Sequence, residues 1–96
     1  MITALDIERK LTELKPLLRS KFFVNKIGYF GSFASGKQEE NSDVDILVEF
    51  SQPLGWEYFD LTELLEKELK TKVDMVSIKA LKPQLRDGIL HQVKFL

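Results

Sequence analysis

The sequence of residues 26–50 is KIGYFGSFASGKQEENSDVDILVEF, and it sets the fold by placing two strand-like runs on either side of a polar turn. The first run, residues 26–30, is apolar and stops at Gly31. The second run, residues 44–50, alternates Val44, Ile46 and Val48 with other side chains, as a strand does. Between the runs, one helical turn at 32–35 and a polar turn at 36–42 are expected.

The flanking sequence predicts helices at residues 4–19, 56–70 and 81–92 and a further strand at 73–78. Pro16 lies inside the first helical pattern and predicts a kink or an early end near Lys15. The apolar stripe of the second helix is expected to face inward, and its members are Phe59, Leu61, Leu64, Leu65 and Leu69. This order of elements predicts an α/β (α+β) fold in which helices flank a small mixed β-sheet.

Length and composition exclude several classes of protein. With 96 residues the chain is expected to form a single domain, residues 1–96. A net charge of -1 provides no general basic field, so direct nucleic-acid binding is not expected. The absence of cysteine excludes disulfides, thiol catalysis and cysteine zinc sites, and the single histidine excludes a histidine metal cluster. No apolar run is long enough to span a membrane, and a cytoplasmic location is the expectation.

The turn that follows the first strand is suited to a phosphate. Gly31 ends the strand, and the chain turns at once into a short helical segment whose first backbone N–H groups are unpaired. A glycine lets the backbone approach a ligand closely, and the hydroxyl of Ser32 adds a donor. Gly31 and Ser32 are therefore candidate phosphate-binding residues.

Three aspartates are the candidate metal ligands. Asp43 and Asp45 are two residues apart, and on a strand both carboxylates would leave the same face, with Cα atoms roughly 7 Å apart. Asp74 begins the next strand and would join them if the two strands are neighbours. Three such carboxylates satisfy the requirement for two Mg²⁺ ions about 4 Å apart, which activate an attacking hydroxyl and stabilise a leaving pyrophosphate. Glu49, further along the same strand face, is a weaker candidate.

These residues resemble the MNT class of minimal nucleotidyltransferases in the DNA polymerase beta superfamily. The resemblance extends over most of the chain, and its motifs are Gly31-Ser32-Phe33-Ala34-Ser35-Gly36, Ser42-Asp43-Val44-Asp45-Ile46-Leu47-Val48, Lys72-Val73-Asp74 and Tyr58-Phe59-Asp60-Leu61. It implies the polymerase beta-like palm fold, in which Gly31 and Ser32 hold the nucleotide phosphates. It also implies that Asp43 and Asp45 bind both metal ions and that Asp74 completes the site and helps to activate the acceptor.

One position departs from the family pattern. The family commonly has arginine where this chain has Ser35, and a serine cannot supply the fixed planar charge of a guanidinium near the phosphates. Lys37, two residues further on, is a candidate to compensate as a nucleotide-binding residue, although a solvated loop lysine is the alternative interpretation. The departure bears on the rate of catalysis more than on metal binding.

Two rival motifs fail at defined positions. Residues 31–37 match the start of a P-loop, but the next residue is Gln38 instead of Ser or Thr, and no long helix follows. An EF-hand loop beginning at Asp43 would need glycine where Val48 stands and glutamate where Leu54 stands.

The expected reaction is the Mg²⁺-dependent transfer of a nucleoside monophosphate from a nucleoside triphosphate to a hydroxyl group. The resemblance implies that the donor is ATP and that the transferred group is AMP. Because the chain is short for a separate acceptor-binding domain, a protein acceptor with its own surface is expected. The resemblance implies that this partner is a HEPN-domain ribonuclease toxin, that a toxin tyrosine is adenylylated, and that the chain acts as the antitoxin in a hetero-oligomer. Two alternatives stay open: an antitoxin with a weakened site that neutralises the toxin by contact, and a subunit of an enzyme that modifies a small molecule.

Overall fold

The structure, a computed structural model, describes residues 2–96 and contains one four-stranded sheet with the strand order β3-β2-β1-β4. The elements in chain order are α1 (Ala4–Phe22), β1 (Val24–Phe30), α2 (Ser32–Ser35), β2 (Val44–Phe50), α3 (Glu57–Leu69), β3 (Val73–Ser77), the 3-10 helix η1 (Ile78–Ala80), α4 (Pro83–Gln92) and β4 (Lys94–Phe95). The expected α/β (α+β) fold with a small mixed sheet is confirmed: β1 pairs antiparallel with β2 and β4, and β2 pairs parallel with β3.

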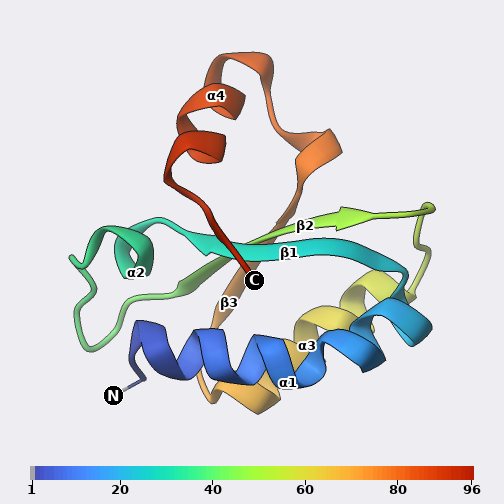
Figure 1. The fold of residues 1–96 in the computed structure, drawn as a ribbon, viewed down its shortest axis with the longest axis horizontal. Helices are drawn as coiled ribbons and strands as arrows, with labels where there is room; N and C mark the ends of the chain where they lie inside the picture. The colour runs from blue at the N-terminus through green and yellow to red at the C-terminus, as the bar shows by residue number, and fades with distance from the viewer. Residues whose placement is uncertain (1) are drawn as a thin grey trace.

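The two faces of the sheet are covered unequally. Helices α1 and α3 lie side by side on one face, and α4 stands on the other face (Figure 1). The α1/α3 face holds the main hydrophobic core, to which β2 contributes Val44, Ile46 and Val48 and β3 contributes Val73 and Met75. Because side chains alternate along a strand, the residues between these positions face the α4 side.

Helix α1 continues through Pro16, so the expected early end near Lys15 is wrong and the kink is the alternative that stays a prediction. The proline removes the hydrogen bond that its N–H would donate to the carbonyl of Thr12, but both residues are exposed, and water can satisfy that carbonyl. A capping box at Thr3 and Asp6 starts the helix, and the buried residues that hold it to the core are Ile7, Leu11, Leu18 and Phe22.

Helix α3 is placed as expected, but one residue of its predicted inward stripe faces solvent. Leu61, Leu65 and Leu69 are buried, whereas the Phe59 side chain is 60% exposed. Phe59 packs on the ring of Trp56, and the two centroids are 5.9 Å apart. The inward stripe of α3 therefore includes Tyr58, which packs against the core, in place of Phe59.

The C-terminal residues form a strand that the sequence did not predict. β4 pairs with β1 at Gly28 and Tyr29, and the Lys15 ammonium donates to the Leu96 carbonyl at 2.9 Å. A Cβ on Gly28 would lie 2.6 Å from the Lys94 carbonyl oxygen, so only glycine allows this close approach. None of the helices between residues 2 and 96 has the length and apolar character that a membrane crossing requires.

Candidate active site

Asp45 and Asp74 lie directly beside each other on neighbouring strands. They are register partners in the parallel β2–β3 ladder, so their Cα atoms are about 4.8 Å apart. Both alternate with core residues, which places both on the α4 side of the sheet, opposite α1 and α3. The sequence-based condition that the strand of Asp74 must neighbour that of Asp45 is therefore met.

The candidate phosphate-binding turn lies next to Asp45, and Gly31 is the residue of the turn that approaches it. It follows β1, whose last residue, Phe30, is the register partner of Asp45 in the antiparallel β1–β2 ladder. The Gly31 backbone has φ 72° and ψ -145°, a conformation open to glycine and strained for other residues. A Cβ at this position would lie 2.1 Å from Oδ2 of Asp45. Gly31, Asp45 and Asp74 thus follow one another across three adjacent strands.

Asp43 stands at the edge of this row, which differs from the expectation. It precedes β2 instead of lying within it, is exposed, and lines a hollow of about 390 Å³ together with Glu40, Asn41, Thr71 and Lys72. The β2–β3 ladder begins at Val44, so strand pairing does not fix the Asp43 side chain, whose negative charge nevertheless raises the pKa of Asp45.

The local charge distribution disfavours a charged Asp45. Burial raises the pKa of the half-buried Asp45 carboxyl, and the negative charges of Asp74 and then Asp43 raise this pKa further. Burial, followed by the Asp74 charge, also raises the pKa of the Tyr58 hydroxyl, which donates to the Met75 carbonyl at 2.8 Å. All three aspartates therefore interact electrostatically through one site.

The donor chemistry of this site fits Mg²⁺, while the side chains are not gathered around one point. Within residues 2–96, no group of three or more Asp, Glu or His side chains is arranged to hold a metal ion as it stands. Three carboxylates supply the oxygen ligands that Mg²⁺ prefers, and Mg²⁺ is commonly held by one or two carboxylates with substrate phosphates and water. The mutual repulsion that raises the pKa of Asp45 is the repulsion that a divalent cation would relieve.

A side chain that the sequence analysis did not single out contacts the candidate phosphate-binding turn. The Gly31 N–H donates to Oε1 of Gln92, at 3.0 Å, from the last residue of α4. Ser32, half-buried, begins the four-residue helix α2, and its carbonyl accepts from the Lys37 N–H at 2.9 Å. No local sequence signal indicated Gln92, because it reaches Gly31 only through the fold of the C-terminal segment.

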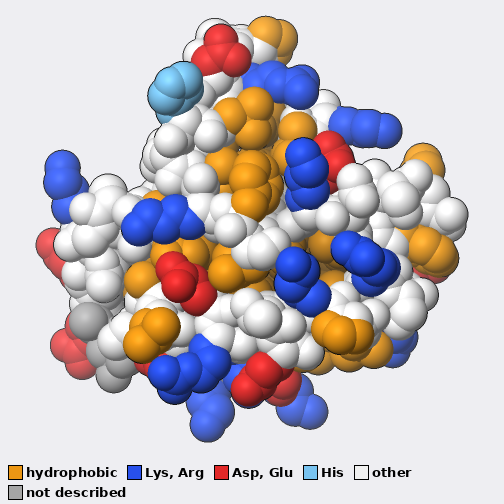
Figure 2. All heavy atoms as spheres, in the orientation of Figure 1, with side chains coloured by type: hydrophobic (Ala, Val, Ile, Leu, Met, Phe, Trp, Pro, Cys, Tyr) orange, Lys and Arg blue, Asp and Glu red, His pale blue; other side chains and the backbone are white. Residues whose placement is uncertain are grey.

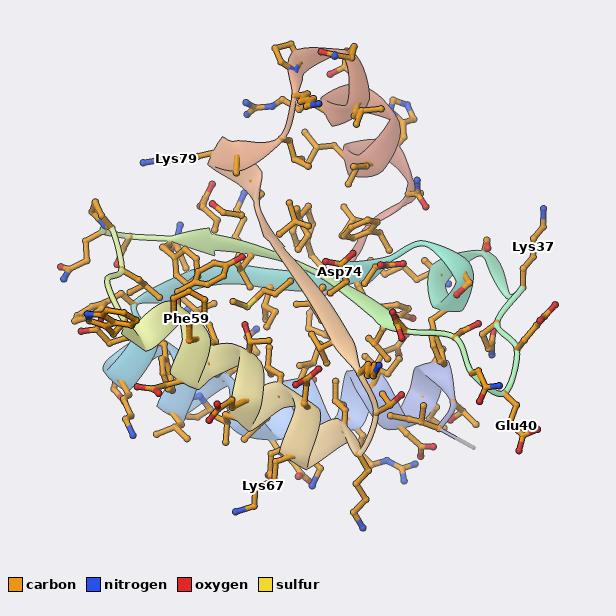
Figure 3. All side chains as sticks on the ribbon, turned by 180° about the vertical axis from the view of Figure 1, so that it is seen from behind. Lys37, Glu40, Phe59, Lys67, Asp74 and Lys79 are labelled. Atoms are coloured by element: carbon orange, nitrogen blue, oxygen red, sulfur yellow. The ribbon has the colours of Figure 1, made fainter. Side chains whose placement is uncertain are left out.

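The remaining candidate residues lie further from the carboxylates. Figure 3 shows Asp74 near the centre of the molecule and Lys37 on the turn at one side, with its side chain pointing away from the protein. Ser35 is exposed, and its hydroxyl donates to the Ser32 carbonyl at 3.2 Å. The Glu49 carboxylate accepts from the side-chain amide of Asn25. The structure therefore does not bring Lys37 or Glu49 to the row of aspartates, and the role of Lys37 stays a prediction.

Replacing Asp45 by Asn is expected to stabilise the metal-free fold. Folding raises the pKa of this carboxyl, so its charge costs stability at every pH above the folded-state pKa. Removing about 0.5 kcal/mol of such repulsion should raise the melting temperature by about 2–4 °C at pH 7 in EDTA. The gain should vanish as the pH falls below the ordinary Asp pKa of about 3.9, where both side chains are neutral. Thermal unfolding by circular dichroism tests this, with the exposed Asp87→Asn as control; a lower melting temperature for Asp45→Asn at pH 7 would contradict it.

Comparison with known proteins gives consistent matches. Residues 12–96 match the family described as "Polymerase beta, Nucleotidyltransferase". The protein adenylyltransferase MntA of Thermococcus cleftensis is 40% identical over 97 residues, which span 100% of this chain and 98% of the relative.

Solved structures agree with the fold. A structure of a minimal nucleotidyltransferase superposes with a TM-score of 0.85 at 28% identity, covering 99% of this chain and 97% of the other. A crystal structure of a toxin–antitoxin with AMP-PNP matches with a TM-score of 0.70 at 26% identity, covering 98% of this chain and 72% of that one. The expected nucleotidyltransferase fold is thus confirmed.

Proposed function

The chain belongs to the polymerase beta nucleotidyltransferase family, and from this premise we propose that it is an Mg²⁺-dependent adenylyltransferase that modifies a partner toxin. The observation that carries the proposal is the row of Gly31, Asp45 and Asp74 across three adjacent strands on one face of the sheet. In this row the turn that we propose to bind phosphate lies beside two carboxylates.

The acidic residues and the glycine turn have complementary roles in this proposal. Asp43, Asp45 and Asp74 would hold two Mg²⁺ ions, and the Gly31 N–H and the Ser32 hydroxyl would bind phosphate oxygens of ATP. When bound, Mg²⁺ supplies positive charge that neutralises the phosphates and lowers the pKa of the acceptor hydroxyl. The protein contributes position and charge, which are the main requirements of phosphoryl transfer.

The order of the row supports one direction for the transfer. Asp74 lies on the far side of Asp45 from Gly31, so the acceptor hydroxyl would approach from β3 while the triphosphate lies over the turn after β1. The acceptor oxygen forms a bond to the α-phosphorus, the bond to the bridging oxygen breaks, and pyrophosphate leaves. Asp74 is the carboxylate placed to orient the acceptor and to take its proton.

The acceptor in this proposal is a protein. The MntA relative is named a protein adenylyltransferase, and the structural relative with AMP-PNP is a toxin–antitoxin. We place a tyrosine of a HEPN-domain toxin as the acceptor, as the family resemblance implies, and ATP as the donor in the cytoplasm. An AMP group on a tyrosine adds negative charge and bulk, which would obstruct RNA at a ribonuclease site.

Mass spectrometry tests the reaction. The chain is incubated with ATP, Mg²⁺ and the HEPN-type protein encoded beside it, and intact mass is followed by peptide mapping. The proposal expects the mass of one or more AMP groups on a tyrosine of the partner, dependent on Mg²⁺. Neutralisation of the partner with no mass change would support instead an antitoxin that acts by contact, the alternative that Ser35 favours.

Ser35→Arg is expected to raise the rate of transfer by about tenfold with little change in folding. An arginine at this position supplies a planar cation near the phosphates, and one charge-assisted contact in a transition state is worth about this factor. Ser35 is exposed, and its hydroxyl makes only a local bond to Ser32, so a long side chain has room. Single-turnover kinetics and thermal unfolding measure both effects, with Ser35→Gln as the uncharged control. Equal rates for the arginine variant and the parent would show that the serine is harmless.

A further inference from the structure

The contact between Gly31 and Gln92 joins the proposed nucleotide site to the C-terminal helix. The Gly31 N–H donates to Oε1 of Gln92 across 61 residues of sequence, at 3.0 Å. A backbone N–H carries one hydrogen and makes one strong bond. A phosphate oxygen and the Gln92 carbonyl therefore compete for the same donor.

The fold fixes where Gln92 stands. It is the last residue of α4, and β4 begins two residues later at Lys94, which pairs with Tyr29 of β1. Gly31 lies two residues after Tyr29, and Gln92 lies two residues before Lys94. Because β1 and β4 are antiparallel, the pairing of Tyr29 with Lys94 brings Gln92 close to Gly31 at the end of β1. Figure 1 shows α4 standing clear of the sheet, and none of its residues is buried. The side chain of Gln92 is itself exposed and free to rotate away.

A neutral acceptor suits this position when no cation is present. The carboxylate of Asp45 lies against the Cα of Gly31, and the charges of Asp74 and Asp43 are close enough to raise the pKa of Asp45. An anion alone would be repelled there, whereas an amide oxygen satisfies the donor without adding charge. Figure 2 shows hydrophobic side chains gathered below α4, on the side that faces the sheet.

We propose that Gln92 is a placeholder for a phosphate oxygen: its amide occupies the Gly31 N–H in the nucleotide-free protein, the triphosphate displaces it, and Gln92 thereby sets the nucleotide affinity. The inference rests on the proposed function, because it takes the Gly31 corner as the triphosphate site. It assigns Gln92 as a residue that lowers ATP affinity by holding the Gly31 N–H.

Calorimetric titration with Mg²⁺ and a non-hydrolysable ATP analogue tests the proposal. Gln92→Ala removes the competitor and should tighten binding by about three- to tenfold, the worth of one hydrogen bond. Gln92→Glu places a like charge beside the phosphates and should weaken binding by at least about tenfold. Gln84→Ala, an exposed glutamine at the other end of α4, is the matched control and should bind as the parent does. Weaker or unchanged binding by Gln92→Ala would overturn the proposal.

Hydrogen exchange of the Gly31 amide provides a readout that needs no nucleotide. The Gln92 contact should protect this amide in the parent and in Gln84→Ala, and Gln92→Ala should exchange faster by a similar three- to tenfold factor. Unchanged exchange would overturn the placeholder role. If the parent binds nucleotide and Gln92→Ala does not change its affinity, the role of Gln92 is contradicted but the proposed function is not. If the parent binds no nucleotide, the proposed function is contradicted as well.

Discussion

The Asp43→Ala, Asp45→Ala double variant is expected to lose nucleotidyl transfer by at least about a thousandfold while keeping its fold. Asp45 stands between Gly31 and Asp74 in the row across the sheet, so its removal breaks the link between the phosphate-binding turn and the acceptor side. Asp43 is exposed and Asp45 half-buried, so neither loss opens a large cavity in the core. Transfer is measured with radiolabelled ATP and the partner protein.

A double variant of equal charge change controls for electrostatics. Glu13 and Glu63 are exposed carboxylates on α1 and α3, away from the sheet face that holds the aspartates, and Glu13 makes only a surface ion pair with Lys10. Glu13→Ala with Glu63→Ala should keep transfer within about twofold of the parent. If the double aspartate variant modifies the toxin at the rate of the parent, Asp43 and Asp45 have no role in catalysis.

Gly31→Ala is expected to have the second largest effect, because it combines backbone strain with a collision. The φ of 72° costs an alanine about 2–3 kcal/mol of folding free energy together with the unusual ψ. The new methyl would also lie 2.1 Å from Oδ2 of Asp45, so the carboxylate must move. We expect a clear loss of stability in denaturant titrations and a loss of transfer of about a hundredfold or more in the fraction that remains folded.

Gly36 provides the matched control for this variant. Its φ is 75°, nearly that of Gly31, but a Cβ there would meet no atom within 4 Å. Gly36→Ala should therefore cost about 1 kcal/mol through backbone strain alone and keep the transfer rate of the parent. Equal losses of transfer in the two variants would show that the close approach of Gly31 to Asp45 does not matter for catalysis.

Local sequence patterns were sufficient for most of the sheet. The alternation from Val44 to Phe50 predicted β2 with its observed bounds, because one face of that strand is packed on the helices. The sequence predicted that Asp74 would join Asp45 if their strands are neighbours, and the parallel β2–β3 ladder confirms that they are.

The features that escaped prediction depend on contacts distant in sequence. The pairing of β4 is only two residues long, and the close approach at Gly28 that permits it appears only once the chain has folded back. Gln92 reaches Gly31 as a consequence of that pairing. The exposure of Phe59 likewise reflects where α3 meets the sheet, which its apolar pattern alone does not define.

We expect the row of aspartates and the glycine turn to hold a divalent cation together with a triphosphate. The most direct test is a crystal structure with Mn²⁺ and a non-hydrolysable ATP analogue, with the metal located by anomalous scattering. The account predicts Mn²⁺ about 2.1 Å from carboxylate oxygens of Asp43, Asp45 and Asp74, with a phosphate oxygen on the Gly31 N–H. Mn²⁺ bound away from these carboxylates, or a triphosphate bound away from Gly31, would contradict it.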